Sequence, residues 1–362
     1  MKITRINAYK FRNLEMLDYR PQPGLNILVG DNAQGKTSIL ESIYALAHTN
    51  SFRTHNDRNM VNYHSNFFQL RSEYRQGDRV IQACLSYGPE RGKEYKINNQ
   101  RAMRQHEDRL RVVLFTPDDL YLIKGNPEKR RAFMDNILKN LYPEYSYYYN
   151  KYGKILKKRN LLLKSGVADV NSLKVVNEMY VENAVPLILA RIALMRSLEE
   201  NGRMHCGDMN EEGTLKIRYA LSFPVNSGKI NFDTASQSMK ACLQEKRGDE
   251  WRRKTSLIGP HLDDLHIYLD DKMASDYASQ GQVRTIAVSL KLAEIHTVKK
   301  TTGFYPVFLI DDILSELDEK RKQKLLDYLQ KADFQSFLTT VSLGGLYCPQ
   351  AAVKEVHGGK IK

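Results

Sequence analysis

The sequence lacks any apolar run long enough to cross a membrane. A spanning helix needs about 18 or more consecutive apolar residues, and no segment of this 362-residue chain approaches that length. The opening residues, MKITRINAYK, also lack the apolar core of a signal peptide. These absences argue against membrane and secreted proteins, and the sequence predicts a cytoplasmic one.

Cysteine is scarce, and the four present are far apart. Cys84, Cys206, Cys242 and Cys348 form no C-x-x-C pair and have no spacing typical of metal ligands. We therefore expect four reduced thiols, most of them ordinary core or half-buried residues. The sequence also shows no internal repeat and no low-complexity linker.

Acidic residues are fewer than basic ones. Fifty-five Lys and Arg against forty-two Asp and Glu give a formal net charge of +13, which favours polyanionic partners. Basic clusters lie at residues 129–131, 157–159, 252–254 and 320–324. Any one cluster is equally well explained as a solvated helix face. Together they favour nucleic acid over a small acidic metabolite.

The stretch VGDNAQGKTS, residues 29–38, fits the pattern G-x-x-x-x-G-K-[ST]. A short apolar run at residues 26–29 precedes it and is typical of a buried parallel strand, while apolar residues at helical spacing follow. In a strand, loop and helix of this kind, backbone N–H groups surround a nucleotide phosphate. We expect Lys36 to reach the β- and γ-phosphates and Thr37 to bind Mg²⁺. The alternative is a glycine-rich turn with an exposed lysine.

A second candidate strand ends in two acids. Residues 307–310 are apolar and precede Asp311 and Asp312. In a nucleotide hydrolase the first acid holds the Mg²⁺ shell and the second orients or deprotonates the attacking water. The alternative is a strand that ends in an acidic turn or a helix cap.

The segment SQGQ, residues 279–282, precedes an amphipathic helix and supplies a hydroxyl, a glycine and N–H donors. A single molecule needs only one phosphate-binding loop for each Mg²⁺ site. In a dimer, however, the Ser279 loop of one subunit can close over the nucleotide held by Lys36 of the other. The alternative is a simple helix N-cap at Ser279.

The pattern of apolar residues along the chain predicts an α/β protein with a helical insertion. Short alternating runs at residues 2–9 and 80–87 indicate strands, and apolar residues at helical spacing dominate residues 127–198. A strand at residues 215–223 and a helix at residues 237–246 follow. We expect an N-terminal half of an ATPase head at residues 1–126, a mainly helical arm at 127–254 and the C-terminal half of the head at 255–362.

Two features have two interpretations each. His261 is equally well a contact to the nucleotide site or a structural histidine at a strand end. The tyrosine run at residues 145–149 beside Lys151 and Lys154 could stack on bases, although such runs more often pack one helix against its neighbour.

The order of these motifs resembles the ABC-type, SMC-like P-loop ATPase heads of chromosome maintenance, and most closely the RecF family of bacterial DNA replication and repair proteins. The resemblance covers nearly the whole chain and rests on segments that are weak singly and specific in this order. These segments are residues 10–14, 51–54, 114–135, 158–160, 259–261, 263–265, 279–294 and 311–318.

The resemblance implies a role for each matching residue. Asp312 would be the catalytic acid, Asp311 with Thr37 the Mg²⁺ site, and Lys36 and Ser279 the further catalytic groups. Asp318 would lie at the dimer seam. The residues implied to bind ATP are Gly30, Asp31, Asn32, Ala33, Gln34, Gly35, Lys36, Thr37, Ser38, Arg12, Ser279, Gln280, Gly281 and Gln282.

The chain departs from the family pattern at a few positions. Transporter-type relatives carry Glu where Asp312 stands and a histidine where this chain offers Thr339 or Thr340, and both changes favour slow turnover. Leu262 and Val283 stand where the repair family usually has Arg and Gln. A role assumed for that arginine therefore has no basis here.

The resemblance implies an ATP-driven homodimer that binds double-stranded and gapped DNA, with weak DNA-stimulated ATPase activity. It implies RecR and RecO as partners and, indirectly, the RecA recombinase. A transporter subunit would be shorter and less basic, and a long-armed chromosome-structuring ATPase would need far longer coiled coils. An SMC-like scaffold with little or no turnover remains the alternative.

Overall fold

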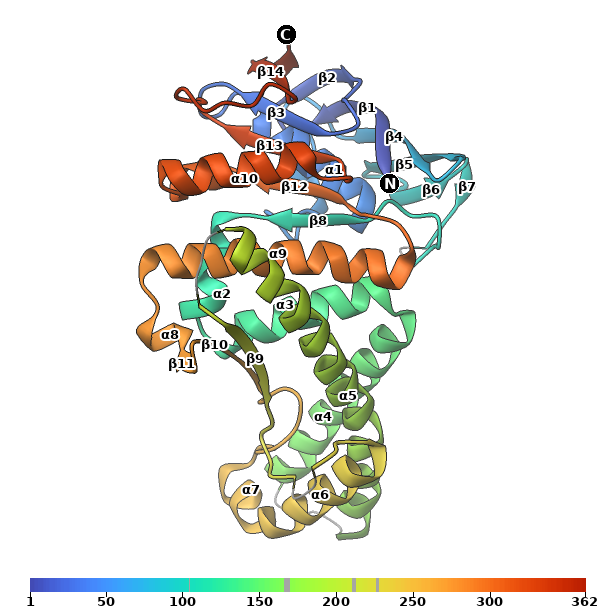
Figure 1. Ribbon diagram of the computed structural model, residues 1–362. Coiled ribbons are helices and arrows are strands. Elements are labelled where there is room, and N and C mark those ends of the chain that lie inside the picture. The colour runs from blue at the N-terminus through green and yellow to red at the C-terminus, as the bar shows by residue number, and fades with distance from the viewer. Residues whose placement is uncertain (104, 166–169, 210–212, 226–227) are drawn as a thin grey trace. The chain divides into compact units, whose positions relative to one another are not determined.

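The computed structural model describes residues 1–103, 105–165, 170–209, 213–225 and 228–362 (Figure 1). They form two compact units. The first consists chiefly of Met1–Leu120 and Ala287–Lys362, and the second of Tyr121–Gly207 and residues 213–286. Residues 255–286, which we assigned to an ATPase head, thus group with the second unit. The functional domain boundaries at 126 and 254 stay a prediction.

An antiparallel sheet in the first unit has the strand order β2-β1-β4-β5-β6-β7. Its longer strands bury one face, as in β4, where Phe68 and Leu70 are buried, Gln69 between them is half-buried and Arg71 is exposed. This alternation is the signal that predicts strands at residues 2–9 and 80–87, and both are confirmed. The strands are β1 (Lys2–Phe11), β2 (Leu14–Tyr19), β4 (Phe68–Gln76), β5 (Arg79–Gly88), β6 (Gly92–Ile97) and β7 (Gln100–Arg101).

A second sheet has the order β15-β14-β3-β13-β12-β8, and all its pairs are parallel except β14 with β15. The predicted strands at residues 26–29 and 307–310 are β3 and β12, and both are nearly fully buried. Because parallel strands share a carboxyl edge, the residues that follow them meet there. The strands are β3 (Leu25–Val29), β8 (Val112–Phe115), β12 (Val307–Asp311), β13 (Ser336–Thr340), β14 (Ala352–His357) and β15 (Lys360–Ile361).

Helix α1 (Lys36–His48) lies between the two sheets, where it contacts β1, β4 and β5 of one and β8, β12 and β13 of the other. The helix is buried on nearly all sides: Ile39, Leu40 and Ile43 have no exposed surface, and most of its polar residues are buried as well. Its first turn is therefore held at the carboxyl edge of the parallel strands. The unit also contains α10 (Glu319–Lys331) and the 3-10 helices η1 (Asp57–Met60), η2 (Pro117–Leu120) and η3 (Ile313–Glu316).

The second unit is mainly helical, with a small antiparallel sheet in the order β11-β10-β9 (Figure 1). Its helices are α2 (Tyr121–Lys124), α3 (Pro127–Leu141), α4 (Pro143–Ser165), α5 (Val170–Asp208), α6 (Phe232–Glu245), α7 (Arg247–Arg253) and α8 (Ala274–Tyr277). Its strands are β9 (Leu215–Ala220), β10 (Asp264–Leu269) and β11 (Lys272–Met273), and helix α9 (Gln280–Thr302) passes from this unit into the first.

Two boundaries in this unit differ from prediction. Helix α6 begins at Phe232 rather than near residue 237, because Asn231 and Thr234 cap each other's backbone N–H groups in a capping box. Strand β9 ends at Ala220, before residue 223, because the N–H of Ser222 donates to Asp263 instead of continuing the ladder. Within the described residues, none of the helices combines the length and apolar character needed to cross a membrane.

Candidate functional site

The glycine loop between β3 and α1 is built as the sequence predicts. Gly35 has φ 107°, a conformation that favours glycine, and α1 begins at the next residue. Among the described residues, no side chain caps this helix. The N–H groups of its first turn and the positive end of its dipole are therefore suited to receive an anion.

Lys36 is the first residue of α1, and its side chain reaches back to the loop. Its ammonium donates hydrogen bonds to the backbone carbonyls of Gly30 and Asp31, the latter at 2.8 Å, and the residue is only 7% exposed. The lysine thus ties the start of the loop to its end. A phosphate bound at this loop would lie beside both the Lys36 ammonium and the N-terminus of α1.

Asp311, at the end of β12, is hydrogen-bonded to two hydroxyl groups. Its Oδ1 accepts hydrogen bonds from Thr37 at 2.9 Å and from Thr339 of β13 at 2.8 Å. The Thr339 oxygen also accepts the backbone N–H of Asp312 at 3.0 Å. A carboxylate beside a threonine hydroxyl is a ligand pair that suits Mg²⁺, a cation that prefers oxygen. Of the two threonines that we considered, Thr339 is the one beside the acids, whereas Thr340 donates to Ser342.

Asp312 adjoins this pair in a left-handed backbone conformation, φ 52°. Partial burial raises the pKa of its carboxyl group, the negative charge of Asp311 raises it further, and Lys36 opposes the shift. A carboxylate with a raised pKa is a better proton acceptor than an ordinary aspartate. The position and basicity of Asp312 therefore suit a general base.

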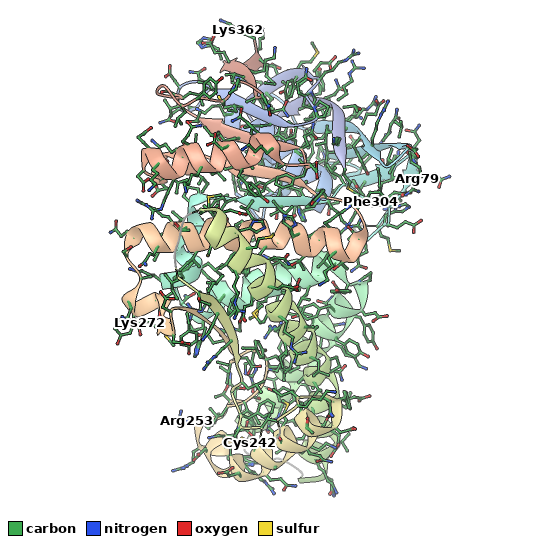
Figure 2. The ribbon with its side chains drawn as sticks, viewed as in Figure 1. Arg79, Cys242, Arg253, Lys272, Phe304 and Lys362 are labelled. Carbon is green, nitrogen blue, oxygen red and sulfur yellow. The ribbon has the colours of Figure 1, made fainter. Side chains whose placement is uncertain are left out.

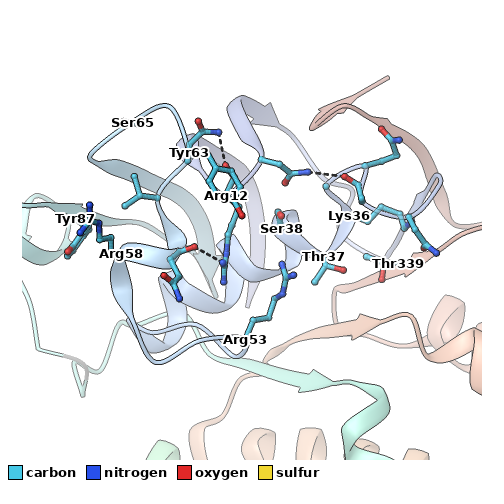
Figure 3. Close-up of a pocket in the computed structure, with 18 of the residues that line it drawn as sticks. Arg12, Lys36, Thr37, Ser38, Arg53, Arg58, Tyr63, Ser65, Tyr87 and Thr339 are labelled. Carbon is cyan, nitrogen blue, oxygen red and sulfur yellow. Dashed lines mark hydrogen bonds between the residues drawn. The ribbon is translucent and has the colours of Figure 1, made fainter.

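Lys36, Thr37, Asp312 and Thr339 line one pocket of about 1230 Å³ (Figure 3). Figure 3 shows Lys36, Thr37 and Thr339 at one end of the pocket and Arg58 and Tyr87 at the other. The pocket is lined by Arg12, Asn13, residues 32–38, Arg53, Arg58, Asn59, residues 61–63, Ser65, Asn66, Tyr87, Pro89, Asp312 and Thr339. It is several times larger than one phosphate group requires, which leaves room for the rest of a nucleotide.

A buried carboxylate beneath the pocket orients two arginines that line it. Glu41 on α1 has no exposed surface and accepts hydrogen bonds from Arg12 at 2.6 and 3.0 Å, from Arg53 at 3.3 Å and from Ser51 at 2.5 Å. Arg12 is thereby held by a bidentate pair, the strong form of this interaction. Arg12 lines the same pocket as the glycine loop, and its contact with a nucleotide stays a prediction.

The carboxyl-terminal hairpin supports the glycine loop from outside the pocket. The N–H groups of Gly358 and Gly359, in the turn between β14 and β15, donate to Oε1 and to the backbone O of Gln34 at 2.7 and 2.8 Å. A Cβ atom on Gly359 would lie 2.7 Å from the carbonyl oxygen of Asn13. The turn therefore accepts no side chain at this position.

We did not foresee the contributions of Glu41, Arg53 and this hairpin from the sequence. An acidic residue among the apolar residues of α1 was the available signal for Glu41, because a buried acid requires a partner. Arg53 lies within the segment 51–54 on which the resemblance rests, but we assigned it no role. For the hairpin the sequence offered no signal, since Gln34 and Gly359 are 325 positions apart in the numbering.

The SQGQ segment belongs to the second unit, whereas the residues of the pocket belong to the first. Ser279 and Gln282 cap each other reciprocally at the start of α9, with N–H to side-chain distances of 3.0 and 3.2 Å. This is the N-cap that we considered as the alternative, and a helix start of this kind also presents N–H donors. The action of Ser279, Gln280, Gly281 and Gln282 on a partner's nucleotide stays a prediction. Asp318 caps α10 and pairs with Arg321, and its place at a dimer seam also stays a prediction.

His261 and the tyrosine run belong to the second unit. The ring of His261 is hydrogen-bonded to Tyr152 at 2.7 Å, and burial lowers its pKa to about 4, so this histidine is neutral at pH 7. Tyr145 is buried and donates to Asp135, which is the packing role, whereas Tyr147 is 58% exposed. The structure thus gives His261 a structural contact and divides the run between packing and surface.

The fold and the site together define an ABC-type P-loop ATPase head. The model of the RecF/RecN/SMC N terminal domain matches residues 2–348. A DNA replication and repair protein RecF from Staphylococcus epidermidis is 36% identical over 355 residues, which cover 96% of this chain and 95% of that protein. RecF of Halalkalibacterium halodurans is also 36% identical, over 100% and 99% of the two chains. The chain therefore belongs to the RecF family.

Solved structures agree with this assignment. A structure of the recombination mediator protein RecF with ATPrS, in the RecFOR pathway, has a TM-score of 0.88 at 27% identity and covers 99% of this chain and 97% of its own. An SMC head bound to the C-winged helix domain of ScpA has a TM-score of 0.58 at 15% identity. The second likeness shows the fold alone and confirms the predicted ABC-type head.

Proposed function

We propose that this protein is an ATP-dependent DNA-binding mediator of recombination and repair. The observation that carries the proposal is the bonding of Thr37 and Thr339 to Asp311 beside an uncapped helix start and a lysine. These are the groups that the binding of a nucleoside triphosphate and Mg²⁺ requires. Further support comes from solved relatives described as RecF with ATP and with ATPrS.

In this proposal each group of residues at the pocket has a separate role. The loop at residues 30–35 and the first turn of α1 surround the phosphates, and Lys36 moves from the loop carbonyls to the β- and γ-phosphates. Thr37 and Asp311 hold Mg²⁺, which would neutralise charge on the phosphate oxygens. Asp312 takes a proton from the attacking water, and its short side chain favours slow hydrolysis.

The nucleotide would act mainly as a reversible clamp between two copies of the chain. Each triphosphate, bound by Lys36 of one copy and the Ser279 loop of the other, adds charge-assisted hydrogen bonds to the seam. Closure joins two basic surfaces into one site for duplex DNA near gaps or single-strand junctions. With RecR and RecO the dimer would promote loading of RecA, and slow hydrolysis would release it in the cytoplasm.

The test is the oligomeric state with and without ATP, followed by light scattering. The parental chain is expected to dimerise with ATP, and Lys36→Ala to remain a monomer. Lys354→Ala, an exposed lysine on β14, is the matched control and is expected to behave as the parent. A parental protein that stays monomeric at saturating ATP, with and without DNA, would overturn the clamp.

Hydrolysis on gapped duplex, blunt duplex and single-stranded DNA separates the mediator from an SMC-like scaffold. We expect slow turnover that gapped DNA stimulates most. Nucleotide-dependent DNA binding without any turnover would identify the scaffold instead.

A further inference from the structure

The antiparallel sheet of the first unit presents a polar face opposite its buried one. Residues of β4 alternate between the core and this face, and β1, β5 and β6 do the same. Antiparallel sheets often leave one face to water. This face is unusual in its charge, because seven cations stand against three acids. They are Lys2, Arg5, Arg71, Arg75, Arg91, Lys96 and Arg101 against Asp18, Glu73 and Glu94.

One row of directly opposite residues crosses all six strands. The register joins Asp18, Asn7, Arg71, Cys84, Lys96 and Arg101 in that order. Directly opposite side chains lie on the same face of a sheet. With strands about 4.8 Å apart, Arg71 and Arg101 are separated by three strand intervals, or about 14 Å. That span is comparable to the width of a DNA groove, about 12 Å for the major groove.

A hollow of about 470 Å³ lies on this face. It is lined by Arg5, Asn7, Gln69, Arg71, Ser72, Glu73, Gln82, Ala83, Cys84, Ser86, Arg91, Glu94, Lys96 and Asn99. Amides, hydroxyls and guanidinium groups are the side chains that contact phosphate and sugar in protein–DNA complexes. The lining has no aromatic or large aliphatic anchor of the kind that dominates a protein–protein interface.

Part of this positive charge is not neutralised within the chain. Arg5 pairs with Asp18 at 2.6 Å and Lys96 with Glu94 at 3.0 Å. Among the described residues, neither Arg71 nor Arg91 forms a salt bridge, although Arg71 contacts the Cys84 thiol. Lys2 and Arg75 stand directly opposite each other, an arrangement of like charges that destabilises a sheet. A bound polyanion would relieve that repulsion.

We propose that this hollow is a binding site for the sugar-phosphate backbone of duplex DNA. The assignment rests on the proposed DNA-binding function and names the surface that performs it. Strand β5 supplies Cys84 and Ser86 to the hollow, and the next residue, Tyr87, lines the nucleotide pocket. DNA on this face and a nucleotide in the pocket would therefore contact the same strand.

The first test measures the salt dependence of duplex binding in the presence of ATP. Each lost phosphate contact lowers the slope of log K against log salt by about 1. The double variant Arg71→Gln/Arg91→Gln is therefore expected to lower the slope by about 2. The matched control is Arg196→Gln/Lys272→Gln in the second unit, where both residues are exposed and lie outside the basic clusters; Figure 2 labels Lys272. The control is expected to keep the parental slope.

The outcomes separate this assignment from the proposed function. A parental protein that binds no duplex at any salt concentration overturns both. Parental binding with an unchanged slope in the Arg71→Gln/Arg91→Gln variant overturns only the assignment of the surface. Circular dichroism and ATP binding are expected to match the parent in both variants, because none of the four substituted residues lines the nucleotide pocket within the described residues.

A second test uses the cysteine in the hollow without any mutation. Cys84 and Cys348 are both half-buried, and burial raises the pKa of both thiols. Saturating duplex is expected to slow maleimide labelling of Cys84, followed by peptide mass spectrometry, while labelling of Cys348 keeps its rate. Equal rates at Cys84 with and without bound duplex would overturn the assignment.

Discussion

Thr37 and Asp311 are joined by a hydrogen bond of 2.9 Å across 274 positions of the chain. The bond connects the first turn of α1 to the end of β12. It is possible because α1 packs against the sheet whose carboxyl edge carries the acid. A contact between distant segments thus fixes the position of Thr37, which lines the nucleotide pocket.

The first prediction concerns the metal. Asp311→Asn keeps the size of the side chain but removes the charge that would attract Mg²⁺, so ATP affinity measured by calorimetry with Mg²⁺ should fall about 10- to 100-fold. Affinity in EDTA should change little. Thr339→Val, which removes one of the two hydroxyl donors to Asp311, should have a smaller effect. An Asp311→Asn protein that binds ATP with Mg²⁺ as the parent does would contradict this metal site.

The second prediction follows from the raised pKa of Asp312. A general base must be ionised, so the ATPase rate should rise with pH through this pKa and fall below it. Asp312→Asn should lose that acid limb and about 10²- to 10⁴-fold of the rate. A kcat profile against pH for both proteins provides the measurement. An acid limb that persists in the Asn variant would assign the base elsewhere.

The same shift has a consequence for stability. Because the folded state disfavours the charged carboxylate, Asp312 binds its proton at higher pH in the folded chain than in the unfolded one. Its contribution to the unfolding free energy therefore decreases as the pH rises from the unfolded pKa to the folded pKa. Asp312→Asn should raise Tm at pH 7 to 8, and the gain should vanish in acid.

The third prediction concerns the carboxyl-terminal hairpin. Gly359→Ala should weaken ATP binding about tenfold or more, because the added methyl group meets the carbonyl of Asn13 and displaces the turn from Gln34. Gly358→Ala is the matched control, since Gly358 also has positive φ but its Cβ would meet no atom within 4 Å. Fluorescent ATP titrations compare the two. Equal losses in both variants would indicate backbone strain in the turn rather than support of the loop.

The fourth prediction concerns the core of the second unit. Arg159 and Glu250 form an ion pair at 2.6 Å, and each side chain is 1% exposed. Arg159→Met leaves a buried carboxylate without its partner and should lower the unfolding free energy of this unit by about 3–5 kcal/mol. The double variant Arg159→Met/Glu250→Leu should recover much of the loss.

Hydrogen exchange of α4 and α7 reports on that unit directly. Arg252→Met is the control and should cost about 0–1 kcal/mol, because Arg252 is exposed where it pairs with Asp249. If the double variant were no more stable than Arg159→Met, the loss would come from packing of the arginine rather than from the unpaired charge.

Much of the site could be predicted from short segments of sequence. The strand, loop and helix at residues 26–47 and the strand before Asp311 follow from local hydrophobic periodicity and from glycine at positions of positive φ. The period-2 alternation in β1 and β5 likewise identifies strands with one buried face. Helix starts were less predictable, because the cap at Asn231 depends on side-chain hydrogen bonds that leave little trace in the pattern.

By itself, the sequence determined most of the segments that become strands, loops and helices, and it located the glycine loop and the two acids, because backbone preference and amphipathic period act over a few residues. Only the tertiary structure decided that Thr339 rather than Thr340 bonds Asp311, that Glu41 orients Arg12 and Arg53, and that the hairpin turn supports Gln34. These contacts depend on strand order, register and packing between distant segments. Their free energy appears only when the whole unit folds, so no local pattern records it.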